Sequence, residues 1–107
     1  MEDYYSTTDT SFAAYLCCRG YTLLGSVWEG GERMTLVLTH TDQQKRSDMH
    51  KDVLVKQDEF NTFRIYVDDT ERPTTFKEYH QKYRMCLREL KNPVSSTQLE
   101  KNAQNIW

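Results

Sequence analysis

Two runs of β-forming residues with a glycine pair between them constrain this chain more than any other feature. The runs cover residues 22–28 and 33–39, and the segment Glu-Gly-Gly-Glu at 29–32 separates them. Both glycines can adopt the positive φ that a tight turn between antiparallel strands requires. Every other residue from 34 to 38 is Met or Leu, which is typical of a strand with one buried face. The sequence therefore predicts an antiparallel β-hairpin.

The segment before the hairpin is predicted to be a helix over residues 8–19. Thr7, Thr8 and Asp9 have short polar side chains that can accept hydrogen bonds from the first free amides of a helix. Apolar residues then follow at helical spacing, and Gly20 stands where a helix ends in a left-handed residue.

A second helix is predicted over residues 42–58, because a capping box begins at Thr41. The β-branched residues Val53 and Val55 weaken its middle, so the helix could break there. The run at 63–67 is rich in β-formers and could supply a third strand.

The strongest amphipathic pattern covers residues 75–91. A capping box begins at Thr75, and Asn92-Pro93 ends the segment. Its apolar stripe is Phe76, Tyr79, Tyr83, Cys86, Leu87 and Leu90.

The last residues form a short amphipathic tail. A third capping box begins at Thr97, and the apolar residues after it share one face: Leu99, Ala103, Ile106 and Trp107. A helix this short is unstable alone in water, so it is expected to order only by docking on another surface.

Together these elements predict an α+β fold with one helix, an antiparallel hairpin, and two further helices packed on the sheet. A single domain is expected over residues 1–93, with 94–107 as a C-terminal tail that could dock on a partner as a helix, pack back on its own domain or be disordered. A chain of 107 residues buries one modest core. The expected core is Phe12, Leu16, Leu23, Leu36, Leu38, Phe76, Tyr83, Leu87 and Leu90.

Composition and cysteine spacing exclude several classes of protein. Lys and Arg total 14 against 16 Asp and Glu, so the net charge is -2, and overall charge does not drive nucleic-acid binding. Cys17, Cys18 and Cys86 form neither a disulfide framework nor a metal-binding pattern, which favours a reduced compartment without a metal or cofactor. No apolar run approaches the roughly 18 residues of a membrane span, and the acidic start is unlike a signal peptide. A cytoplasmic protein is expected.

Four phrases of the sequence resemble those of a known family. They are T-T-D within residues 5–9, A-A-Y-L at 13–16, G-Y-T-L-L-G at 20–25 and L-R-E-L-K at 87–91. The chain is similar over residues 4–91 to an uncharacterised small-domain family of bacteriophages and bacteria. This resemblance implies a helix–hairpin–helix–helix domain in a viral or mobile-element setting. It brings no established activity and no catalytic residues.

The first functional hypothesis is a non-enzymatic interaction protein. The chain has no catalytic pattern: its best carboxylate cluster, around Asp68 and Asp69, precedes a helix whose dipole favours acids there. With the resemblance, this favours a phage protein that binds and blocks a host protein of antiviral defence, as anti-CRISPR inhibitors do. A homodimer through the tail is a further option. The predicted contact residues are Trp28, Leu99, Ile106 and Trp107.

The alternative is a nucleic-acid-binding accessory protein. Residues 72–91 hold two acids and six bases: Arg72, Lys77, Lys82, Arg84, Arg88 and Lys91. Tyr79, His80 and Tyr83 could stack on bases, although the apolar stripe places the two tyrosines in the core. A third hypothesis, a metal-dependent enzyme around Asp68 and Asp69, predicts a stoichiometric metal in elemental analysis.

Overall fold

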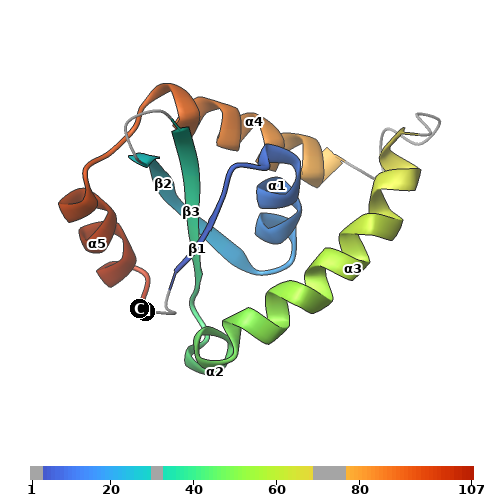
Figure 1. The fold of residues 1–107 in the computed structure, drawn as a ribbon, viewed down its shortest axis with the longest axis horizontal. Helices are drawn as coiled ribbons and strands as arrows, with labels where there is room; N and C mark the ends of the chain where they lie inside the picture. The colour runs from blue at the N-terminus through green and yellow to red at the C-terminus, as the bar shows by residue number, and fades with distance from the viewer. Residues whose placement is uncertain (1–3, 30–32, 69–76) are drawn as a thin grey trace.

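The computed structural model describes residues 4–29, 33–68 and 77–107, and it shows an α+β fold with a three-stranded antiparallel sheet (Figure 1). The elements in chain order are β1 (Tyr5–Thr7), α1 (Thr10–Cys18), β2 (Tyr21–Glu29), β3 (Arg33–His40), α2 (Gln43–Ser47), α3 (Met49–Asp68), α4 (Lys77–Lys91) and α5 (Ser96–Gln104).

The predicted hairpin is confirmed by β2 and β3, which pair from Tyr21 opposite His40 to Glu29 opposite Arg33. The predicted glycine turn lies outside the described residues. The sheet order is β1-β3-β2, so the third strand is β1. The prediction of a strand at 63–67 is wrong, because these residues continue α3. The helix brings the Phe63 ring within 5.0 Å of the Tyr15 ring, centroid to centroid.

The second predicted helix is divided in two, and the expected site of the break is wrong. Asp42 caps α2 by accepting a hydrogen bond from the Gln44 amide at 2.9 Å. The chain turns at Asp48, and α3 then runs unbroken through Val53 and Val55. Packing on one side of α3, rather than local β-branching, decides where the helix continues.

One face of the sheet carries the larger core, where α1, α4 and part of α3 contribute buried side chains. The predicted core residues Phe12, Leu16, Leu36 and Leu38 are buried, and Leu23, Tyr83 and Leu90 pack partly buried against them. Leu87 is a wrong assignment: it is 41% exposed, because it lies beside the inward stripe of α4. Phe76 lies outside the described residues.

The other face of the sheet is covered by α5. Leu99 and Ala103 of α5 pack with Leu24 of β2 and Val37 of β3 in a second, smaller cluster. The predicted tail therefore docks as a helix, although its cap is Ser95 rather than Thr97. In Figure 1, α5 and α3 stand at opposite ends of the molecule, with the sheet between them.

Candidate functional site

The outer face of α4 carries a row of basic side chains. The inward side of α4 places Tyr79 and Cys86 in the core, so the opposite side faces solvent. The exposed bases of α4 follow one another at intervals of seven, four and three residues from Lys77 to Lys91, which puts them on one side of the helix. Within the described part of the chain, none of them forms an ion pair. We call this set the basic face: Lys77, Arg84, Arg88 and Lys91.

Two other predicted bases do not join the basic face. Lys82 is half-buried, and Arg72 lies outside the described residues. The tyrosines do not stand among the exposed bases either. Tyr79 is buried with its ring 5.1 Å from the Phe63 ring, and burial raises its pKa. The basic face therefore has no tyrosine on which a nucleic-acid base could stack. Its exposed aromatic ring is that of His80, three residues after Lys77 and four before Arg84.

Trp28 is 59% exposed near the end of β2, opposite Met34 of β3. Ser26, two residues earlier on the same side of the strand, donates a hydrogen bond to the carbonyl oxygen of Glu89 in α4. A strand advances by about 3.3 Å per residue, which places Trp28 about 7 Å beyond that contact. Trp28 therefore lies on β2 beyond the point where the strand contacts the last turn of α4.

Of the other predicted contact residues, Leu99 and Ile106 pack against their own sheet, whereas Trp107 is 42% exposed. Leu99 is buried, and Ile106 packs half-buried against the same cluster. The Trp107 ring stacks on Tyr4 at 5.7 Å, and its Nε1 donates to Thr39 Oγ1 at 3.3 Å. Thr39 is at the opposite end of the hairpin from Trp28 and on its other face. Trp28 and the tail therefore do not form one surface.

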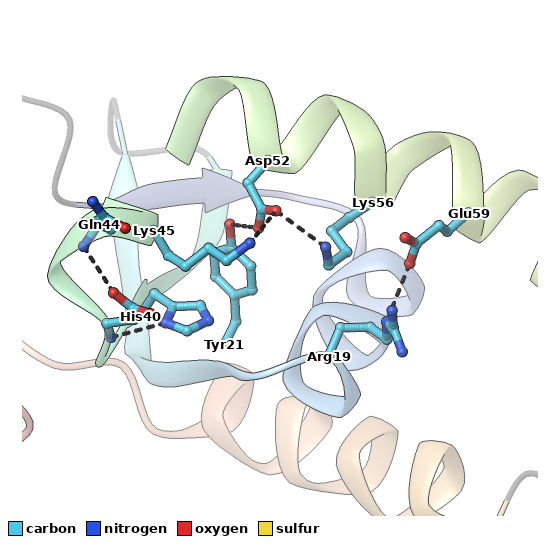
Figure 2. A network of polar contacts seen from close by, with 9 residues as sticks. Arg19, Tyr21, His40, Gln44, Lys45, Asp52, Lys56 and Glu59 are labelled. Atoms are coloured by element: carbon cyan, nitrogen blue, oxygen red, sulfur yellow. Dashed lines mark hydrogen bonds and ion pairs between the residues drawn. The ribbon is translucent and has the colours of Figure 1, made fainter. Parts of the chain in front are cut away.

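A network of polar contacts joins α3 to the sheet (Figure 2). Asp52 of α3 accepts hydrogen bonds from the Tyr21 hydroxyl at 2.7 Å, Lys56 Nζ at 3.1 Å and Lys45 Nζ at 3.5 Å. Burial alone would raise the pKa of Asp52, but the hydrogen bonds from Tyr21 and Lys56 outweigh it, and the pKa is lowered. Tyr21 and Asp52 are 31 positions apart, so no local sequence pattern reveals the contact.

The network extends at both ends. His40 Nδ1 accepts a hydrogen bond from the Asp42 amide at 3.0 Å, and burial lowers the pKa of His40. Glu59 of α3 accepts from the Tyr15 hydroxyl at 2.9 Å and from Arg19 Nε at 3.2 Å. Among the described residues, no buried side-chain nitrogen or oxygen lacks a partner. The arrangement therefore serves to hold α3 against α1 and the sheet.

The cysteines and carboxylates give no metal centre in the described ranges. There, no group of three His, Cys, Asp or Glu side chains could hold a metal ion. Cys17 and Cys86 hydrogen bond to each other in the core; this bond and burial raise the pKa of Cys17, while burial raises the pKa of Cys18 to about 11. Both thiols of α1 therefore stay protonated at neutral pH. Asp68 ends α3, and Asp69 lies outside the described residues.

Comparison with known proteins identifies no function for these surfaces. In the described segments, no helix is both long and apolar enough to cross a membrane. The chain matches no family model, no curated protein and no solved structure.

Proposed function

We propose that this protein is a non-enzymatic interaction protein that binds a host protein and blocks it. The observation that carries the proposal is the basic face of α4, together with the exposed Trp28 near the end of β2. Arg and Trp are among the residue types that dominate binding energy at protein interfaces. Bases that are unpaired within the described chain also attract an acidic partner surface and speed its association. The contact surface we propose is therefore Trp28 together with the basic face.

The resemblance to a phage and bacterial family supports the setting of the proposal. In that setting the blocked host protein belongs to antiviral defence, such as a CRISPR effector, and the inhibitor acts in the host cytoplasm. The docked tail changes the expected surface: Leu99 could reach a partner only if α5 left the sheet. We therefore assign the contact to α4 and β2 rather than to the tail.

The test is capture of partners from host-cell lysate with the full-length protein, with and without nuclease. We expect one stoichiometric protein that survives nuclease, is lost with W28A or with R84E/R88E, and is retained with K101E. Lys101 is an exposed base on α5, outside the basic face, so K101E controls for a change of charge alone. Equal capture by wild type and both surface variants would contradict the proposal. A second readout is plating of a targeted phage on a CRISPR-immune host, which wild type should restore and R84E/R88E should not.

The second candidate is a nucleic-acid-binding accessory protein, and the same unpaired bases favour it. From Lys77 to Lys91 the helix rises about 21 Å, so the four bases can follow several phosphates along a strand. Four phosphate contacts predict a slope of about -3 to -4 when log affinity is plotted against log salt.

Fluorescence anisotropy with labelled single-stranded and duplex oligonucleotides tests this candidate. R84A/R88A/K91A should abolish binding, whereas K101A should leave it unchanged. Binding by the triple variant with an unchanged salt slope would exclude α4 as the nucleic-acid site.

A further inference from the structure

The solvent side of α3 carries an unusual apolar patch. Leu54 and Val55 are 57% and 54% exposed, although they are neighbours in the middle of a long helix. Lys51 lies three residues before Leu54, and Asp58 lies three residues after Val55, so all four side chains share one stripe. Both charged residues are exposed, and neither forms an ion pair within the part of the chain that the structure describes.

The residues of this stripe are complementary to those of a second copy of the helix that runs in the opposite direction. Reading α3 backwards exchanges Lys51 with Asp58 and Leu54 with Val55. A second copy of the helix, placed antiparallel about a two-fold axis between Leu54 and Val55, therefore sets each leucine near a valine. The same axis sets Lys51 of each copy opposite Asp58 of the other, which gives two ion pairs. A parallel copy in register would instead oppose like charges.

We propose that α3 is a self-association surface on which a second copy of this chain packs its own α3 antiparallel. Charge complementarity selects this partner and this direction, and the paired Leu54 and Val55 side chains supply the apolar centre. α3 lies along the outside of the molecule in Figure 1, so a second copy can approach it. With 20 residues, the helix offers about 30 Å of length.

The surroundings of the stripe favour the same contact. An apolar groove of about 300 Å³ lies beside Leu54, lined by Tyr4, Tyr5, Met49 and Val53 among others, and it widens the apolar surface. One helix pair buries less area than a standard interface, so the dimer is weak and forms reversibly with concentration. The surface is separate from the basic face on α4. Self-association and binding of another partner can therefore fail or succeed independently.

Sedimentation equilibrium of the full-length protein over a range of concentrations tests the proposal. Wild type should approach the dimer mass as concentration rises. K51D and D58K each place like charges opposite each other at both ends of the stripe, so each should weaken the dimer at least tenfold. The double variant K51D/D58K restores opposite charges across the axis and should recover the wild-type constant. K101D, which changes charge on α5, should have no effect.

L54S/V55S provides a second test, since it removes the apolar centre and should leave a monomer. Circular dichroism checks that each variant is folded, which is expected because all four side chains are exposed. A wild type that stays monomeric at every concentration would overturn the proposal. A dimer that persists in L54S/V55S, or a folded K51D/D58K that remains as weak as the single variants, would overturn it as well.

Discussion

The two faces of the sheet are closed in different ways. On one face, α1, α4 and part of α3 bury a continuous core whose aromatic rings contact one another, as Phe12, Tyr15 and Phe60 do at 5.4 Å. On the other face, α5 closes a smaller cluster, in which four of the described residues are buried. Because apolar burial sets most of the stability, the first face should unfold only with the whole domain, and α5 should open locally at lower cost.

Specific hydrogen bonds compensate for the small apolar area under α5. A β-bulge makes Leu24 an extra residue in β2, so its carbonyl lies at an irregularity of the ladder. Asn102 of α5 donates to that carbonyl oxygen at 2.9 Å, and the Val94 amide donates to the Ser26 carbonyl oxygen at 2.8 Å. The position of α5 thus depends on directional contacts with one strand, whereas the larger core depends on packing.

Phe60→Ala should have the largest effect, since the ring is fully buried between α1 and α3. The expected loss is about 3–5 kcal/mol of unfolding free energy, from lost burial and the cavity left behind. Urea denaturation followed by circular dichroism measures it. Leu87→Ala is the matched control on an exposed apolar side chain, and it should cost less than about 1 kcal/mol. Similar losses in both variants would mean that the large core does not dominate stability.

Gly25→Ala should act on the α5 face alone. Gly25 has a φ of +151°, which L-residues rarely adopt, and an added Cβ would lie 3.0 Å from Val94 Cγ2. We expect a cost of about 1–3 kcal/mol, seen as detachment of α5. Hydrogen exchange of the α5 amides and Trp107 fluorescence report it. Adding Val94→Ala should recover the steric part, whereas loss of protection throughout the larger core would contradict a local effect.

The same contrast explains what could be predicted from the sequence. Periodic segments gave α1, the hairpin and α4, because their signals are local. The strand β1 was missed, since Tyr5–Thr7 is extended only through pairing with β3. The run 63–67 has β-forming residues, but ring contacts of Phe63 with Tyr15 and Tyr79 favour the helix.

Local sequence pattern likewise predicted one part of the candidate site and missed another. The bases of α4 and the exposure of Trp28 follow from local pattern, so both were predicted. Packing of the tail on its own domain was one alternative, but the site for Leu99 was not assigned. Gly25 within the strand run is a signal for the bulge beside Leu24, yet it does not indicate which segment packs there. The Asp52 network was missed because its members come from three separate segments of the chain: β2, α2 and α3.

Acid should weaken the α3 side and leave the α5 contacts unchanged. The pKa of Asp52 is lower in the folded protein than its ordinary value of about 3.9. Its contribution to stability is therefore complete above that value and is lost as pH falls through the folded pKa. Urea midpoints measured from pH 6 downward should fall more steeply for wild type than for Asp52→Asn. Parallel curves for the two proteins would show that Asp52 does not contribute to acid sensitivity.

Asn102→Ala should have the smallest effect and sharpen the contrast between the two faces. It removes the hydrogen bond to the Leu24 carbonyl oxygen and leaves that acceptor without its side-chain partner. The change also removes the bond that Asn102 Oδ1 accepts from Gln98 Nε2 at 2.9 Å, which is exposed. The expected loss is about 1 kcal/mol, because both bonds are neutral and no large cavity forms. Faster hydrogen exchange confined to α5 would show it, with Gln104→Ala as the exposed control on the same helix. If Asn102→Ala instead lowered the global unfolding free energy as much as Phe60→Ala, α5 would belong to the cooperative core, and the two faces would not differ in stability.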